Sequence, residues 1–254
     1  MKRTSSFWPQ RAARLSGLLY LVVIVGGGFA ELGVRERFLV AGDAVATANN
    51  ILANESQFRW GFTSDLIAVL CVVPLIYLLY ELLKDANRHV ARAAVLFSLV
   101  GTAVQSVALL GHFAPLILLK RGVALGVAID LLRAQTYMAL QLQGIGYAVA
   151  LTFFGGTMLF RGYLIVRSAI VPRAIGVALM VEGVAYWANS FLNFLATPGF
   201  AGAALQILMA TGLAEVALCL WLLIMGVNVQ RWQELRGVAD GSARTPSRVG
   251  FAAR

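Results

Sequence analysis

Two acidic residues, Glu182 and Glu215, lie inside long apolar stretches of this sequence. Insertion of a carboxyl group at the centre of a bilayer costs on the order of 3 kcal/mol, so such a residue is a candidate for function. Two carboxylates that lie close together in a medium of low dielectric would share a proton, because both cannot easily hold a negative charge there. The pair could couple a process to a proton, anchor a ligand, or act as general acid and base. We take Glu182 and Glu215 as the candidate catalytic residues.

Further polar side chains recur at helical spacing in the same stretches. Glu182, Tyr186, Asn189 and Asn193 stand at offsets of 0, 4, 7 and 11 and so share one helical face. Polar faces avoid lipid, so we expect this face and its counterparts in other stretches to line a polar interior. The candidate ligand-binding residues are Glu31, Asp65, Gln105, His112, Gln141, Tyr186, Asn189 and Asn193.

Each of these side chains also has a purely structural interpretation. Amide and hydroxyl groups on inward faces commonly do no more than form hydrogen bonds between helices. Glu31 and Asp65 could pair with Arg35 and Arg59 near the ends of their stretches. A lone histidine such as His112 is more often a hydrogen-bonded packing residue than a ligand.

Six apolar segments must position these residues. A hydrocarbon core of about 30 Å requires about 20 apolar residues of helix, and the segments that reach this length are residues 15–34, 62–83, 93–119, 137–160, 174–197 and 203–227. Hydrophobic residues make up 59% and charged residues 13% of the chain, whereas a soluble domain has about 25% charged residues. The sequence predicts an all-α, polytopic membrane helix bundle of six transmembrane helices with short interfacial helices. The predicted parts are a cytoplasmic N-terminus (1–14), the transmembrane domain (15–228) and a basic, mostly disordered cytoplasmic tail (229–254).

The basic residues predict the orientation of the bundle. With six spans, both termini and two connecting segments fall on one side, and those segments contain Lys84, Arg88, Arg92, Arg161, Arg167 and Arg173. The positive-inside rule assigns this side to the cytoplasm, so we expect a multi-pass protein of the cytoplasmic (inner) membrane. Basic loops also favour contact with anionic membrane lipids, which accounts for the net charge of +9 without any nucleic-acid partner.

Two short segments on the opposite side are expected to lie on the membrane surface. Asp43 is placed to cap a helix that runs to Asn54, and residues 121–135 carry apolar residues at helical spacing. Together they could form a lid.

A rise of about 1.5 Å per residue puts Glu182 and Glu215 at a similar depth. We expect them to face each other at the narrow end of a polar pocket that opens outward.

The sequence contains no cofactor motif. A Schiff base inside the bundle would require a lysine, and the lysines are Lys2, Lys84 and Lys120, all outside the apolar cores. Haem ligation by two histidines lacks candidates, because His89 lies in a loop. No spacing motif supports a metal site made from His112, Glu31 and Asp65. We expect neither a metal nor another cofactor.

Several short segments resemble a known family. They are Ala13–Tyr20 (ARLSGLLY), Gly42–Ala53 (GDAVATANNILA), Phe153–Gly155 (FFG), and Gly162–Ser168 (GYLIVRS) followed by Pro172–Arg173. In this order they are similar to the bacterial membrane family catalogued as domain of unknown function 4386, over nearly the whole chain. The resemblance implies a bacterial cytoplasmic-membrane protein and lends no established activity. The family often has a histidine after the Phe-Phe-Gly segment, where this chain has Gly156 and Thr157, which argues against a metal or proton role for that span.

Three functions are compatible with these residues. The leading hypothesis is binding or transport of a small apolar or amphipathic molecule in an outward-facing polar pocket, with Glu182 or Glu215 as anchor or proton-coupling group. One alternative is a cofactor-free intramembrane enzyme that uses the paired carboxylates on a lipid or isoprenoid. Another is a membrane scaffold or accessory subunit whose polar groups only specify helix packing. A homodimer also suits a bundle of this size, although no interface is legible in the sequence.

Overall fold

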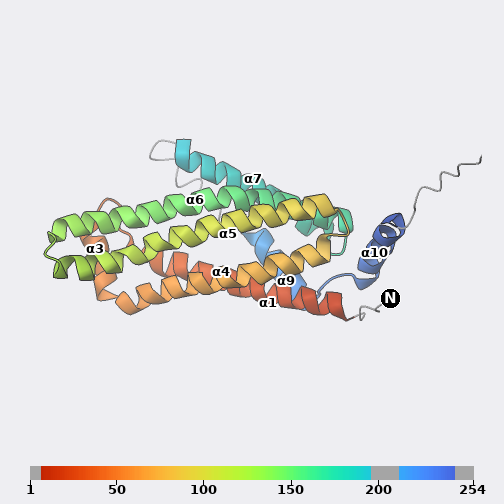
Figure 1. Cartoon of the computed structure of the whole chain (residues 1–254), viewed down its shortest axis with the longest axis horizontal. Coiled ribbons are helices and arrows are strands. Elements are labelled where there is room, and N and C mark those ends of the chain that lie inside the picture. The colour runs from red at the N-terminus through yellow and green to blue at the C-terminus, as the bar shows by residue number, and fades with distance from the viewer. Residues whose placement is uncertain (1–6, 196–211, 244–254) are drawn as a thin grey trace, which may run out of the picture.

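The fold is a bundle of long helices. The computed structural model describes residues 7–195 and 212–243, and this part of the chain contains helices and no β-strand (Figure 1). The long helices are α1 (Trp8–Gly28), α4 (Glu55–Leu83), α5 (Arg88–Ile117), α6 (Ile129–Ser168) and α7 (Arg173–Leu195). The shorter elements are the π-helical η1 (Phe29–Arg35) and η2 (Leu118–Gly122), together with α2 (Glu36–Phe38), α3 (Ala44–Ala53), α9 (Leu213–Ile224) and α10 (Val229–Ala243).

Five helical units are long and apolar enough to cross a membrane: Trp8–Phe38, Glu55–Leu83, Arg88–Gly122, Ile129–Ser168 and Arg173–Leu195. The α9–α10 pair passes the same test together and is bent by 94° at the break between the two helices. The prediction of a polytopic helical membrane bundle is therefore confirmed. The sixth predicted span, residues 203–227, is described only in part, because residues 203–211 lie outside the described ranges.

Most helices pack against their neighbours in the sequence, and α1 also packs against α9 from the other end of the chain. α6 lies between α5 and α7, and α1 lies between α4 and α9. Small residues bring α6 and α7 close together, as is common between membrane helices. A Cβ atom added at Gly155 would come within 2.8 Å of the Gly183 carbonyl oxygen, and one at Gly176 within 2.7 Å of the Gly162 carbonyl oxygen. Close backbone approach therefore fixes the α6–α7 interface.

The bundle has two distinct ends, which we call the α3 end and the α10 end (Figure 1). At the α3 end, the Asp43 side chain accepts a hydrogen bond of 2.8 Å from the backbone nitrogen of Ala46, so the predicted cap of α3 is confirmed. α3 packs against α6 and α5 through a buried face that contains Thr47, Ala48 and Ile51. The helix is thus part of the bundle's packing and does not simply lie flat on its surface.

The structure corrects the prediction of a separate surface helix over residues 121–135. η2 ends at Gly122, the chain turns through Gly126 with a φ of +77°, and residues from Ile129 onward belong to α6. The apolar spacing in this segment was helical, but it belongs to the first turns of a 40-residue helix. Leu132 accordingly packs inside the bundle with 2% exposure.

At the α10 end, α10 is held against the start of α1. The Trp232 ring lies 5.7 Å from the Trp8 ring, between centroids, and the Arg236 guanidinium lies 4.8 Å from the centre of the Trp232 ring. Trp232 is buried although the rest of α10 is mostly polar. These contacts turn α10 across the end of the bundle instead of extending α9.

Candidate functional site

Five polar residues from four helices meet in the half of the bundle nearer to α10. They are Tyr20 from α1, Arg161 from α6, Glu182 and Tyr186 from α7, and Glu215 from α9. We call this group the carboxylate–tyrosine cluster. At about 1.5 Å per residue, Glu182 lies about 14 Å from the start of α7 and Glu215 about 14 Å from the end of α9. The two carboxyl groups therefore lie at the same level of the bundle.

Hydroxyl groups connect the two carboxyl groups. Tyr20 Oη lies 2.6 Å from Glu215 Oε1, and Tyr186 Oη lies 2.9 Å from Glu215 Oε2. Tyr186 Oη also lies 3.2 Å from Glu182 Oε1. Glu182 is 0% exposed, and its Oε2 has no hydrogen-bond partner among the described residues. Glu215 is thus the carboxyl group of the pair with more hydrogen-bond partners.

The single hydroxyl hydrogen of Tyr186 indicates which carboxyl group holds the proton that the pair shares. A tyrosine hydroxyl has one hydrogen to donate, so Tyr186 cannot donate to both carboxyl groups. An ionised carboxylate attracts donors more strongly than a neutral acid, and the shorter contact is the one to Glu215. A protonated Glu182 that donates to the Tyr186 oxygen satisfies the remaining contact. In this arrangement Glu182 is the neutral member of the pair and Glu215 the ionised one.

A buried arginine offsets the negative charge of Glu215. Arg161 is 7% exposed, and its Nη1 donates to Tyr20 Oη across 3.3 Å. Tyr20 accepts from Arg161 and donates to Glu215, so a single hydroxyl group links the cation to the anion. One proton on the carboxyl pair leaves one negative charge, which Arg161 balances. The cluster is then neutral overall, as a low-dielectric interior requires.

A second group of polar residues lies nearer to the α3 end. Arg35, the last residue of η1, bonds Glu31 through Nε at 2.7 Å and Nη2 at 2.5 Å. Its Nη1 bonds the Asp65 carboxylate and lies 3.3 Å from His112 Nδ1. We call Glu31, Arg35, Asp65 and His112 the arginine–histidine cluster. Glu31 and Asp65 thus pair with Arg35, as the structural interpretation of the sequence predicted. Arg59 pairs with Glu55 instead.

The partners of His112 define its tautomer. An arginine side chain can only donate hydrogen bonds, so His112 Nδ1 accepts from Arg35. His112 Nε2 then carries the hydrogen and donates to the Phe58 carbonyl oxygen, 3.1 Å away. The ring is neutral and fully buried, and it stacks on Phe58 with 4.4 Å between ring centroids. The guanidinium of Arg35 lies between the acids and the histidine and is the common partner of all three.

The remaining candidate residues do not join either cluster. Gln141 is exposed and donates to Tyr137 Oη at 2.9 Å. Asn189 is buried, and its carbonyl oxygen accepts from the exposed Asn193 at 3.0 Å. Gln105 is partly buried and has no hydrogen-bond partner among the described residues. Of the predicted ligand-binding residues, only Tyr186 therefore contacts the two glutamates.

Sequence reasoning placed two arginines wrongly. Arg161 was assigned to the loop between the fourth and fifth spans, but it lies inside α6 and is buried. The predicted first span ends at residue 34, but the next residue, Arg35, is 8% exposed within η1. In both cases an apolar stretch was ended at the first arginine, although the helix continues. The sequence signal that could have pointed to a buried partner for Arg161 is Tyr20, which shares a buried helical face with Ser16.

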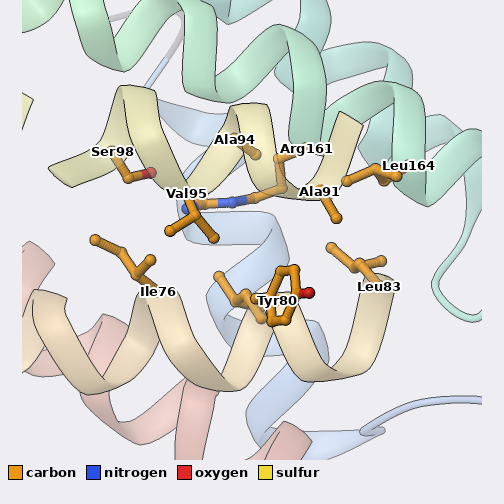
Figure 2. A pocket seen from close by; sticks show the side chains of 10 residues that line it. Ile76, Tyr80, Leu83, Ala91, Ala94, Val95, Ser98, Arg161 and Leu164 are labelled. Carbon is orange, nitrogen blue, oxygen red and sulfur yellow. The ribbon is translucent and has the colours of Figure 1, made fainter. Parts of the chain in front are cut away.

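A cavity lies beside the carboxylate–tyrosine cluster, between α4, α5 and α6 (Figure 2). Its volume is about 20 Å³, which is room for one or two water-sized groups. It is lined by Ile76, Leu79, Tyr80, Leu83, Ala91, Ala94, Val95, Ser98, Arg161 and Leu164. Figure 2 shows the Arg161 side chain directed into the space between α4 and α5. The predicted outward-facing pocket stays a prediction, since this cavity lies toward the α10 end.

The comparison with known families identifies the chain. The model of a family described as Domain of unknown function (DUF4386) matches residues 15–226. The chain belongs to the DUF4386 family. No curated protein and no solved structure matches the sequence.

The DUF4386 match contains both clusters. It begins before Tyr20 and ends after Glu215, so it spans every residue of the carboxylate–tyrosine and arginine–histidine clusters. It leaves out α10, whose Trp232 holds the end of the bundle. The family description gives no activity, and any function of this DUF4386 chain must come from the chemistry of its own side chains.

Proposed function

We propose that this protein binds or transports a small apolar or amphipathic molecule and couples that step to a proton held between Glu182 and Glu215. The supporting observation is the single hydrogen of Tyr186, which leaves a protonated Glu182 beside an ionised Glu215. Such a pair takes up or releases one proton while its hydrogen-bond partners stay in place. Ionisable groups at this depth of a membrane bundle typically mark proton or substrate pathways.

We also propose that the protein lies in the cytoplasmic membrane with its α10 end in the cytoplasm. Exposed basic side chains at that end include Arg11, Arg14, Arg88, Arg92, Arg173 and Arg231. The positive-inside rule supports this orientation. Single cysteines introduced at Arg173 and at Leu125, which are exposed at opposite ends, test it in intact cells. A membrane-impermeant thiol reagent should label the cysteine at position 125 and not the one at 173, and the reverse labelling would overturn the orientation.

The proton assignment is tested by infrared spectroscopy of the protein in lipid nanodiscs. A protonated buried carboxyl group gives a carbonyl stretch distinct from that of a carboxylate, and we expect it in the wild-type protein at neutral pH. Glu182→Gln should remove this band. Glu234→Gln, which changes an exposed glutamate on α10, serves as the control and should leave it intact. A wild-type spectrum without the band would refute the shared proton.

The coupled molecule is sought by native mass spectrometry of protein extracted in mild detergent. We expect a stoichiometric small molecule that is reduced or lost in the Glu182→Gln protein and kept in the Glu234→Gln control. A protonated acid beside an ionised carboxylate is also the arrangement of a general acid and base. An altered membrane lipid in cells that overproduce the wild type, absent with Glu182→Gln, would favour the intramembrane enzyme instead. A tightly bound polypeptide without a small molecule would favour the scaffold.

A further inference from the structure

Arg161 has donors that the carboxylate–tyrosine cluster does not use. A guanidinium carries five N–H groups, and only one contact, from Nη1 to Tyr20, has a partner among the described residues. No carboxylate in the described ranges lies within ion-pair distance of Arg161. Arg161 is only 7% exposed, and its side chain lines the cavity between α4 and α5. An arginine in such a place is costly unless something satisfies its free donors.

The walls of the cavity are mostly apolar, with Tyr80 and Ser98 as polar members besides Arg161. α4 contributes Ile76, Leu79 and Leu83, and α5 contributes Ala91 and Val95 (Figure 2). Arg161 is the only charged side chain in the lining. It lies seven residues before the end of α6, which is about 10 Å from that end. A molecule seated here would place a negative group at Arg161 and an apolar chain along α4 and α5.

Basic residues surround the approach to the cavity from the α10 end. Lys84 lies 5.7 Å from the centre of the Tyr80 ring, which lines the cavity, but its charge is paired with Glu81 at 2.6 Å, so the uncompensated charge comes from two arginines. Arg88 and Arg92 lie close to the Tyr80 hydroxyl. Both arginines are exposed. Positive charge at the entrance raises the local concentration of anions and disfavours cations.

We propose that the Arg161 cavity binds the carboxylate of an apolar monocarboxylate whose hydrocarbon chain lies between α4 and α5. A carboxylate presents two oxygens in one plane, which match the guanidinium fork. A space of about 20 Å³ holds about two such oxygens but not a phosphate diester with its glycerol, so it encloses the carboxylate alone and the hydrocarbon chain leaves it between α4 and α5. Resting on the proposed function, we further identify this ligand as the molecule whose binding is coupled to the proton.

The charge balance of the cluster provides the coupling. The groups that face the carboxyl pair are Tyr20 from α1, Tyr147 and Arg161 from α6, and Tyr186 from α7. Of these only Arg161 is charged, and Glu215 is its counter-charge. A second proton on the pair neutralises Glu215 and leaves Arg161 without an anion. The ligand carboxylate then replaces Glu215 as the counter-charge, so proton binding and carboxylate binding strengthen each other, as linkage requires.

The site is tested with a dodecanoate analogue that carries a photoreactive diazirine in its chain. The protein is placed in phosphatidylcholine nanodiscs, irradiated with the probe, and digested for mass spectrometry. We expect adducts on α4 and α5 at positions that line the cavity. Dodecanoate should compete with the probe, whereas dodecanol and acetate should compete much less. Equal competition by dodecanol, or adducts spread over the lipid-facing surface, would overturn the carboxylate site.

Two pairs of variants separate binding from folding. Arg161→Gln should reduce specific labelling on the order of tenfold or more, while Arg173→Gln, which removes an exposed arginine at the same end, should not. Ala94→Phe fills the cavity and leaves Arg161 in place, so it should also abolish labelling. Its control is Leu96→Phe, since Leu96 is 63% exposed on the same helix. Labelling that survives in the folded Ala94→Phe protein would refute the site.

The link to the proton is tested separately. Dodecane sulfonate keeps its charge at every pH used, and we expect it to compete several-fold better at acidic than at neutral pH. In Glu215→Gln, whose pair can no longer take up the second proton, this pH dependence should be lost. A pH-independent competition with intact labelling would leave the carboxylate site standing and refute its coupling to Glu182 and Glu215. Loss of labelling in Ala94→Phe but not in Arg161→Gln would refute the role of the guanidinium.

Discussion

The assignment of the shared proton to Glu182 makes two chemically identical substitutions unequal. In Glu182→Gln a neutral acid becomes a neutral amide of nearly the same shape. The new N–H group can still donate to the Tyr186 oxygen, and the carbonyl oxygen takes the place of an atom that already has no partner. One neutral hydrogen bond is changed, so the expected loss in the free energy of unfolding is about 1 kcal/mol.

Glu215→Gln removes an ionised acceptor. The amide has one acceptor oxygen for the two hydroxyl groups of Tyr20 and Tyr186, and Arg161 loses its counter-charge. Removal of one partner from a buried ion pair typically costs about 3–5 kcal/mol. Because the Tyr20 hydroxyl stands between the two charges here, we expect the low end, about 3 kcal/mol. The difference of about 2 kcal/mol between the two variants corresponds to a factor of roughly 30 in the unfolding equilibrium.

Reversible unfolding in bicelles, followed by tryptophan fluorescence, measures both losses. The exposed Glu234→Gln control should stay within about 0.5 kcal/mol of the wild type. If Glu182→Gln lost as much stability as Glu215→Gln, or more, the hydrogen count at Tyr186 would be wrong. The double variant Glu215→Gln with Arg161→Gln adds a further check. It should be less destabilised than the sum of the single variants, because the unpaired cation is gone.

Three further tests address other parts of the fold. Gly183→Ala places a Cβ atom 2.5 Å from a carbonyl oxygen of α6 and should cost about 1–3 kcal/mol, whereas Gly27→Ala, with nothing within 4 Å of its Cβ, should be tolerated. The yield of monodisperse protein compares the two. Asp43→Ala removes the α3 cap at a cost of about 1 kcal/mol, visible as faster hydrogen exchange confined to α3. Asp65→Asn should lower stability by about 3 kcal/mol because this acid is buried, and Glu31→Gln by less than about 1 kcal/mol because Glu31 is 42% exposed; thermal denaturation in detergent ranks them.

Hydropathy predicted the bundle because a membrane span needs only length and apolar composition. The α3 cap was also predictable, since Asp43 and its acceptor contact are local in sequence. The burial of Arg35 and Arg161 was not. A window that sums hydropathy treats every arginine as a boundary, whereas the fold buries each one by supplying acceptors from other helices: Asp65 on α4 for Arg35, and the Tyr20 hydroxyl on α1 for Arg161.

The pairing of the two glutamates could likewise be predicted from the sequence only in part. Helical rise gave their common depth, and apolar surroundings suggested that they share a proton. The partners that distribute the proton come from α1 and from the next turn of α7, and only tertiary packing brings Tyr20 to Glu215 across 195 positions of the chain. Depth along a helix follows from sequence, whereas contact between helices depends on rotation about their axes, which a single sequence leaves open.

The unequal lengths of the helices determine how the two clusters sit relative to a bilayer. α7 has 23 residues and α6 has 40, or about 35 and 60 Å, and both meet at the α10 end, so α6 overhangs at the α3 end. α4 has 29 residues and is about 44 Å long. A hydrocarbon layer of about 30 Å that starts at the α10 end reaches only the level of Asp65. A layer placed in this way would have the ion pair of Arg35 at its boundary and Glu182 and Glu215 inside the hydrocarbon. A bilayer a few Å thicker would enclose that ion pair in lipid, and a thinner one would expose it to headgroups and water. Membrane thickness would therefore set the strength of the Arg35 ion pair at the α3 end.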